Sequence, residues 1–141
     1  MYKPVMNAGE IEAYMDEVFP EVDYYGFKVP AVGNGTVTVS MNATGRHLRP
    51  GGTVSGPTLF ALADCAAYYL VIAHIGKVAL AVTTNLNINF VSKPEAGELV
   101  AKANLLKLGK RLAVCEISLY SSADERLVAH ATATYSIPPR D

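Results

Sequence analysis

The residues most able to do chemistry lie in one stretch, RPGGTVSGPTLFALADCAAYYLVIAHIG, where a loop rich in Gly and Pro enters an apolar segment. That segment contains one carboxylate, Asp64. An ionised carboxylate in apolar surroundings costs several kcal/mol unless it is paired or hydrogen-bonded. A carboxylate kept there can act as a general base on water, or as a nucleophile that forms a covalent intermediate. A helix that starts at the loop adds free N–H groups that can stabilise a developing oxyanion.

A structural role is the alternative for these residues. Asp64 could cap a neighbouring backbone group, or meet a lysine across an interface between two copies of the chain. Turn geometry is a sufficient reason for Gly51 and Gly52. Turn geometry is the structural alternative for Gly56 as well.

Other catalytic patterns fit the chain poorly. Ser55 lies one residue too late in GTVSG for a nucleophile elbow, and no strand directly precedes it. The GNGTVT segment lacks the third glycine and the following helix of a dinucleotide fingerprint. The histidines are far apart and lack the spacing of metal ligands: His47, His74 and His130. We therefore expect no metal site and no bound cofactor.

Composition favours a small, near-neutral partner. The 141 residues suit one domain, 1–141, and carry a formal charge of −1, which suggests neither nucleic-acid binding nor a polybasic membrane anchor. The start of the chain has the pattern of an amphipathic helix and not of a signal peptide, so we expect a cytoplasmic protein. The cysteines, Cys65 and Cys115, lie in apolar runs without CxxC spacing, and we expect both to be reduced and buried.

Two helices are predicted. Residues 58–75 are apolar over nearly the roughly 20 residues that span a bilayer, but Asp64 and His74 interrupt them. The pattern indicates a core helix over about 57–75, which other parts of the chain must surround. A peripheral helix is predicted over about 8–19, where Pro20 stops it.

The other segments read as strands. A tight turn at Asn34-Gly35 introduces an alternating strand over 36–43. In the strand over 82–91, Thr83 and three asparagines alternate with apolar residues, so Thr83 is expected on the polar asparagine face. Turns separate three further strands over 98–108, 111–120 and 126–137, and the last four strands are expected to form a meander. Small side chains on one face of the last strand would let the helix approach closely: Ala129, Ala131 and Ala133.

This order predicts an α+β fold, an antiparallel sheet of five to six strands around one long helix. With HLRPGGTVSGPTLFALADCAAY and TTNLNINFVSKPEAGE in place, it resembles the hotdog fold of acyl-CoA thioesterases, in the PaaI-like branch. The resemblance spans 37–137, and a motif similar to HLNPGGTVHGGxxFxLAD aligns with 47–64 without a gap. It implies a homodimer, often doubled to a tetramer, with joined sheets and two active sites at the seam. It also implies no metal, and the charge and the helix pattern already argue against a membrane.

The resemblance carries three catalytic roles to this chain. Asp64 matches the helix carboxylate, and Gly56 matches the glycine whose N–H polarises the thioester carbonyl. Thr83 matches a Ser or Thr that helps to place the attacking water. The basic side chains of Lys93, Lys110 and Arg111 could meet the phosphates of coenzyme A, or they could simply be solvated.

The chain departs from the motif at three positions that we expect to contact substrate. Arg49, Ser55 and Pro57 stand where Asn, His and Gly are usual. Arg49 could pair with Asp64 of either subunit, bind a charged group on the substrate, or point into solvent. Two hypotheses follow: a thioesterase that acts on acyl-CoA or a related carrier thioester, and a catalytically idle hotdog protein that binds acyl ligands.

Overall fold

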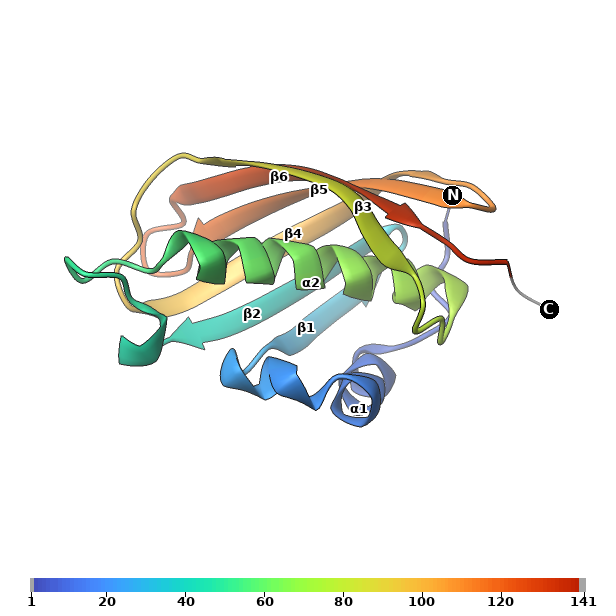
Figure 1. The fold of residues 1–141 in the computed structure, drawn as a ribbon, viewed down its shortest axis with the longest axis horizontal. Helices are drawn as coiled ribbons and strands as arrows, with labels where there is room; N and C mark the ends of the chain where they lie inside the picture. The colour runs from blue at the N-terminus through green and yellow to red at the C-terminus, as the bar shows by residue number, and fades with distance from the viewer. Residues whose placement is uncertain (1, 140–141) are drawn as a thin grey trace.

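An antiparallel sheet curves around one long helix in the computed structural model, which describes residues 2–139 (Figure 1). The helices are α1 (Ala8–Val18) and α2 (Gly56–Ile75), with short 3₁₀ turns η1 (Pro20–Tyr24) and η2 (Gly45–His47). The strands are β1 (Lys28–Gly33), β2 (Thr36–Ala43), β3 (Val82–Phe90), β4 (Gly97–Leu108), β5 (Leu112–Ser121) and β6 (Leu127–Ser136). The α+β prediction is confirmed.

Local capping sets the ends of both helices. The side chain of Asn7 accepts from the Glu10 N–H at 2.8 Å, and Glu10 accepts from the Asn7 N–H at 3.0 Å, so a capping box starts α1. Ser55 caps the start of α2. The helix ends at Gly76, whose φ of 90° suits glycine. Both helices therefore lie within one residue of the predicted bounds.

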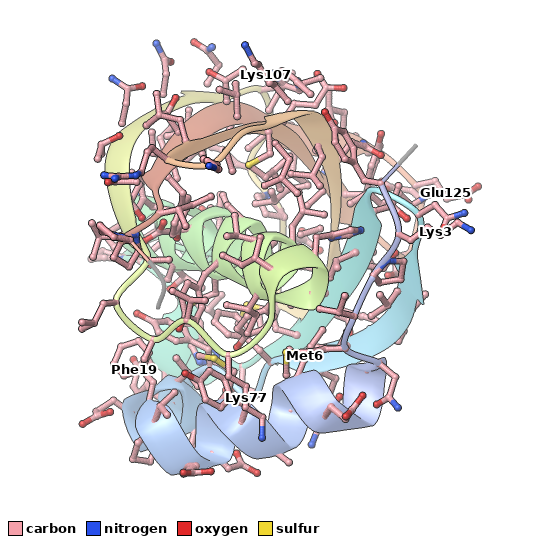
Figure 2. All side chains as sticks on the ribbon, turned by 90° about the vertical axis from the view of Figure 1, so that its right-hand side faces the viewer. Lys3, Met6, Phe19, Lys77, Lys107 and Glu125 are labelled. Carbon is pink, nitrogen blue, oxygen red and sulfur yellow. The ribbon has the colours of Figure 1, made fainter. Side chains whose placement is uncertain are left out.

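Helix α2 is the centre of the core. Viewed nearly along its axis, the sheet arches over α2 and α1 closes the opposite side (Figure 2). Its length and hydropathy would allow it to cross a membrane, but 67% of its apolar window is buried inside the protein. It is a core helix, as predicted.

The strand order is β1-β2-β4-β5-β6-β3, so the predicted four-strand meander is wrong. Strands β4, β5 and β6 do form a meander, but β3 pairs with β6 at the end of the sheet. The reason is that β4 already pairs with β2 on one side and β5 on the other. It has no free edge for β3, whereas β6 has one.

A β-bulge near the start of β3 overturns the predicted face of Thr83. Thr83 is opposite Tyr135, but Asn85 is opposite Thr134, so Thr84 is an extra residue on β3. The extra residue reverses the alternation, and Thr83 faces α2 instead of joining the asparagine face. The hydroxyl of Thr84 donates to the Thr134 carbonyl at 3.2 Å, which fastens the bulge to β6.

The alanine face of β6 sets how closely α2 approaches the sheet. Ala129 and Ala131 are fully buried and Ala133 nearly so, and α2 contacts β6. We expect Ala131→Leu to lower the free energy of unfolding by about 1–3 kcal/mol, because added methylenes overpack a filled core. Urea denaturation measures this value. Thr132→Leu, on the exposed face of the same strand, is the control and should change it by less than about 0.5 kcal/mol. Equal losses in the two variants would contradict the close approach.

Candidate active site

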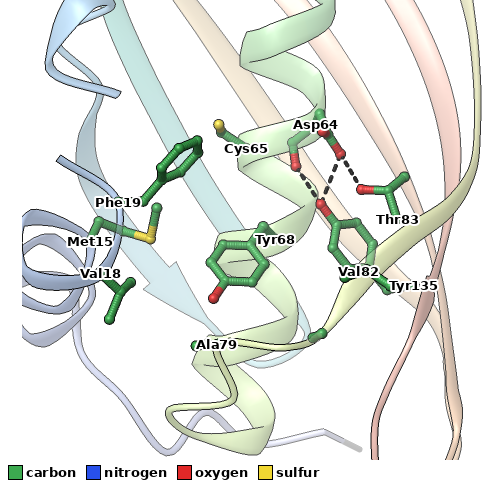
Figure 3. Close-up of a pocket in the computed structure, with 11 residues that line it drawn as sticks. Met15, Val18, Phe19, Asp64, Cys65, Tyr68, Ala79, Val82, Thr83 and Tyr135 are labelled. Atoms are coloured by element: carbon green, nitrogen blue, oxygen red, sulfur yellow. Dashed lines mark hydrogen bonds between the residues drawn. The ribbon is translucent and has the colours of Figure 1, made fainter. Parts of the chain in front are cut away.

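The Asp64 carboxylate is held by two hydroxyl groups. The Thr83 hydroxyl donates to Oδ1 of Asp64 at 2.6 Å, and the Tyr135 hydroxyl donates to the same atom at 2.8 Å. Tyr135 also donates to the Asp64 backbone carbonyl at 3.0 Å (Figure 3). Within residues 2–139, Asp64 forms no ion pair and its Oδ2 accepts no hydrogen bond. The side chain is thus hydrogen-bonded through one oxygen and free at the other.

Tyr135 is the site residue that sequence reasoning missed. It extends the buried face of β6 formed by the alanines, and it pairs directly with Thr83. That alternation was visible in the sequence, but the pairing was hidden once β3 was placed beside β4. Burial raises the pKa of Tyr135 well above its usual value, and the charge of Asp64 raises it further. The hydroxyl therefore stays protonated at neutral pH and donates.

A cavity of about 450 Å³ opens in front of Asp64, between α1, α2 and the start of β3 (Figure 3). Its polar end is formed by Asp64, Thr83 and Tyr135. The other lining residues are mostly apolar: Met15, Val18, Phe19, Cys65, Tyr68, Ala79, Ala81 and Val82. Burial, together with the nearby Tyr14, raises the pKa of Tyr68 to about 12. The cavity suits an apolar group whose reactive end lies at Asp64.

The N-terminus of α2 lies at a second cavity, separate from the one in front of Asp64. The hydroxyl of Ser55 accepts from the Thr58 N–H at 3.2 Å, so Ser55 is the helix cap. Pro57 has no N–H to offer. In the described part of the chain, the Gly56 N–H donates to no acceptor. A cavity of about 200 Å³ at this point is lined by Arg49, Thr53, Val54, Gly56, Leu59, Phe90, Ser92, Lys93 and Pro94.

The predicted catalytic residues therefore fall into two groups. Asp64 and Thr83 are in contact, but Gly56 lies eight residues before Asp64 on the same helix. At a rise of 1.5 Å per residue, this separates them by about 12 Å along the axis. One chain by itself does not bring Gly56 and Asp64 to the same substrate carbonyl.

The predicted substrate-contacting residues are also dispersed. Arg49 is exposed beside Gly56 and Lys93 and does not pair with Asp64 within residues 2–139. Pro57 shares an open groove on α2 with Asp64. Lys110 and Arg111 are exposed in the turn between β4 and β5. They line neither the Asp64 cavity nor the Gly56 cavity.

The two buried histidines have structural hydrogen bonds. Nδ1 of His47 accepts from the Thr44 N–H at 3.0 Å, and its Nε2 lies 2.9 Å from the Tyr24 carbonyl, to which it donates in that tautomer. His74 in the same way joins the Gly35 N–H to the Leu70 carbonyl. Across residues 2–139, no three His, Cys, Asp or Glu side chains gather as metal ligands would.

Comparison with known proteins identifies the family. Residues 51–134 match the family described as the Thioesterase superfamily. The chain belongs to this superfamily. In this thioesterase-superfamily protein, the six-stranded sheet around α2 is the hotdog fold that the sequence resembled. The matched residues include Gly56, Asp64 and Thr83, whereas Tyr135 and α1 lie outside them.

Two solved structures and one sequence relative are similar to this superfamily member. A "putative thioesterase" from Silicibacter sp. TM1040 is 50% identical, with a TM-score of 0.89 over 98% of this chain and 96% of that one. The E. coli PaaI protein from the phenylacetic acid degradation operon is 25% identical, with a TM-score of 0.83 and 94% of each chain covered. A "putative esterase" of Saccharolobus solfataricus is 27% identical over 136 residues, which cover 95% of this chain and 87% of the relative.

The cysteines of this thioesterase-superfamily protein differ in burial. Cys115 is fully buried, as predicted. The prediction was wrong for Cys65, which is partly exposed and lines the cavity next to Asp64. Cys65 lies on the face of α2 toward the cavity and not on the face toward the sheet. Burial, and secondarily the charge of Asp64, raises the pKa of each thiol to about 12.

We expect Cys65 to react slowly with iodoacetamide although it lines a cavity. With a pKa of about 12, roughly one thiol in 10⁴ is ionised at pH 8, and the thiolate is the reactive form. Mass spectrometry of the folded protein between pH 7.5 and 9.5 should show about a tenfold rate increase per pH unit. Both cysteines should react rapidly in urea. A plateau below pH 9 in the folded protein would contradict the raised pKa.

Proposed function

We propose that this protein hydrolyses acyl-CoA or related carrier thioesters, with Asp64 as the catalytic carboxylate. The observation that supports this most is the Asp64 carboxylate, held through Oδ1 by Thr83 and Tyr135 at the end of an apolar cavity. Because Oδ2 has no partner among the described residues, it can accept a hydrogen bond from a water molecule. The acyl group fills the cavity and brings its carbonyl to this water.

Hydrolysis then follows a short sequence of steps. Asp64 takes a proton from the water as the oxygen adds to the thioester carbonyl, which becomes a tetrahedral oxyanion. The oxyanion collapses, the carbon–sulfur bond breaks, and the leaving thiolate takes the proton back from Asp64. In the alternative nucleophilic course, Asp64 attacks the carbonyl itself, and the carbon–sulfur bond breaks to give an anhydride and the thiolate. Water then hydrolyses the anhydride to the free acid and the Asp64 carboxylate, and the proton released goes to the thiolate. Both courses need a donor for the oxyanion, and the proposed donor is the Gly56 N–H.

A second copy of the chain supplies that donor in this proposal. Strand β3 is an edge of the sheet, since β6 pairs with it on one side only. Its ends carry large exposed side chains, with Val82 and Phe90 each 53% exposed and the following Val91 58% exposed. A long exposed edge strand with apolar side chains favours pairing with another strand. We propose a homodimer joined through β3, which can double to a tetramer.

The direction of pairing decides what meets at the seam. Two copies of β3 paired antiparallel place Phe90 of one protomer beside Val82 of its partner. Phe90 lies against Gly56, at 3.7 Å from the position of a Cβ there, and Thr83 next to Val82 holds Asp64. The Gly56 N–H thereby approaches the partner's Asp64, although the two are about 12 Å apart within a chain. Each dimer would have two such sites.

The basic residues fit the polar part of the substrate in this arrangement. Arg49 and Lys93 line the cavity beside Gly56, where they can bind the phosphates of coenzyme A. Lys110 and Arg111 remain candidates for the same phosphates. Their turn lies at the end of the sheet where β3 begins, because Leu112 and Val82 both pair with Ser136.

We expect Asp64→Asn to lower thioester hydrolysis by about 10²- to 10⁴-fold, because the amide keeps the shape of the carboxylate but cannot take a proton or attack. Release of free thiol from a panel of acyl-CoA esters measures the rate. Asp124→Asn changes an exposed turn carboxylate and should retain wild-type turnover. Wild-type turnover in Asp64→Asn would refute the assignment. A wild type that binds acyl-CoA without hydrolysing it would favour the idle binder.

We expect sedimentation velocity to find a dimer or tetramer at micromolar concentration. Asn87→Lys should weaken the dimer, because residue 87 lies near the middle of β3 and an antiparallel pair would bring the two lysines close together. Asn104→Lys makes the same change on β4, an interior strand, and should leave the assembly unchanged. A folded wild-type monomer would contradict the seam.

A further inference from the structure

Tyr135 and Thr83 hold the same oxygen atom from two paired strands. They are directly opposite each other on β6 and β3, and both hydroxyls donate to Oδ1 of Asp64, at 2.8 and 2.6 Å. A carboxylate oxygen has about two lone-pair positions, so these two donors fill Oδ1. The single Tyr135 hydroxyl proton is shared between Oδ1 and the Asp64 backbone carbonyl, which lies 3.0 Å from the hydroxyl oxygen. The hydroxyl is therefore held by the helix backbone as well as by the side chain.

We propose that Tyr135 is a positioning residue for Asp64, which fixes the orientation of the carboxylate and leaves Oδ2 as its basic oxygen. The proposal rests on the thioesterase function proposed above. It goes beyond that function because it assigns the choice between the two carboxylate oxygens to a residue on β6. Tyr135 itself acts only through Asp64.

The surroundings of Tyr135 make it a rigid donor. The residue is only 3% exposed, and its ring lies 6.2 Å from that of Tyr68, centroid to centroid. Since burial raises its pKa far above neutral pH, the hydroxyl proton remains available for donation. The bulge at Thr84 brings Thr83 to the same place from β3. Two donors on one sheet thus meet a carboxylate on the helix.

The pH dependence of Asp64 should report these bonds. Hydrogen bonds to the ionised form of a carboxylate stabilise that form, so removing one makes the group easier to protonate. The other titratable groups around Asp64 come from α2, from β5 and from the segment around η1. They are Cys65, Tyr68, Cys115, Glu21, Tyr24 and Tyr25. Of these, only Glu21 belongs to a type that is ordinarily charged at neutral pH.

The test compares Tyr135→Phe with the wild type in kcat, KM and pH profile. The phenylalanine keeps the buried ring and removes the hydroxyl. We expect kcat to fall roughly 10- to 100-fold with KM nearly unchanged. We expect the acid limb of the kcat profile to move up by about one pH unit. Thr83→Val should move the limb in the same direction, whereas Thr83→Ser, which retains the hydroxyl, should leave kcat within about threefold of the wild type.

Tyr120→Phe is the matched control. It removes a hydroxyl from another sheet tyrosine, whose ring lies under Lys102, and should leave kcat and the pH profile unchanged. If Tyr135 were only structural, Tyr135→Phe would lower the melting temperature without moving the acid limb. That result would overturn the proposal.

A second readout does not depend on activity. In protein with ¹³C-labelled aspartate carboxyl carbons, the NMR titration of Asp64 should move to higher pH in Tyr135→Phe. If the wild type hydrolyses no thioester, the proposed function fails, while this titration still decides the role of Tyr135. An unmoved titration overturns the positioning role whether or not the protein is a thioesterase.

Discussion

The constraint on which the structure depends is the burial of a helix that is apolar on nearly every side. Helix α2 has no face that prefers water along most of its length, so the rest of the chain must surround it. The sheet curves so that β2 to β6 all contact α2, with β3 at the edge of the sheet. Helix α1 packs against β1. Small residues on β6 make the wrapping close, since a larger side chain would hold the helix off the sheet.

The same constraint explains the treatment of Asp64. A carboxylate on a core helix must find hydrogen-bond donors within the wrapping elements, because an unpaired buried carboxylate is costly. The donors are uncharged hydroxyls and not cations. A cation beside a carboxylate favours its ionised form strongly and so weakens it as a base, whereas an uncharged hydroxyl donor does this to a smaller extent. The same hydrogen bonds therefore stabilise the carboxylate within the core and hold it in place for reaction.

The sequence predicts the helices and strands far better than it predicts which strands pair with each other. Helix α2 could be bounded because its apolar run begins and ends sharply in the sequence, and the strands could be recognised from alternation. The position of β3 in the sheet could not be predicted, because it depends on which strand retains a free edge once the sheet has formed. Family resemblance pointed to Thr83 although alternation assigned it to the wrong face. Tyr135 needed the β3–β6 pairing, whereas the separation of Gly56 from Asp64 follows from the predicted helix and its rise per residue.

The bulge in β3 makes the site depend on strand register as well as on residue type. A substitution at Thr84 leaves the number of residues unchanged, so Thr83 still faces the helix. If β3 instead paired regularly through Thr84, Thr84 would stand opposite Tyr135 and the Thr83 hydroxyl would turn to the outer face. Loss of the single residue at 84 would remove the bulge and leave Thr83 opposite Tyr135, still facing the helix. Among relatives, a chain one residue shorter at this point of β3 would therefore hold its carboxylate from a regular strand, without a bulge.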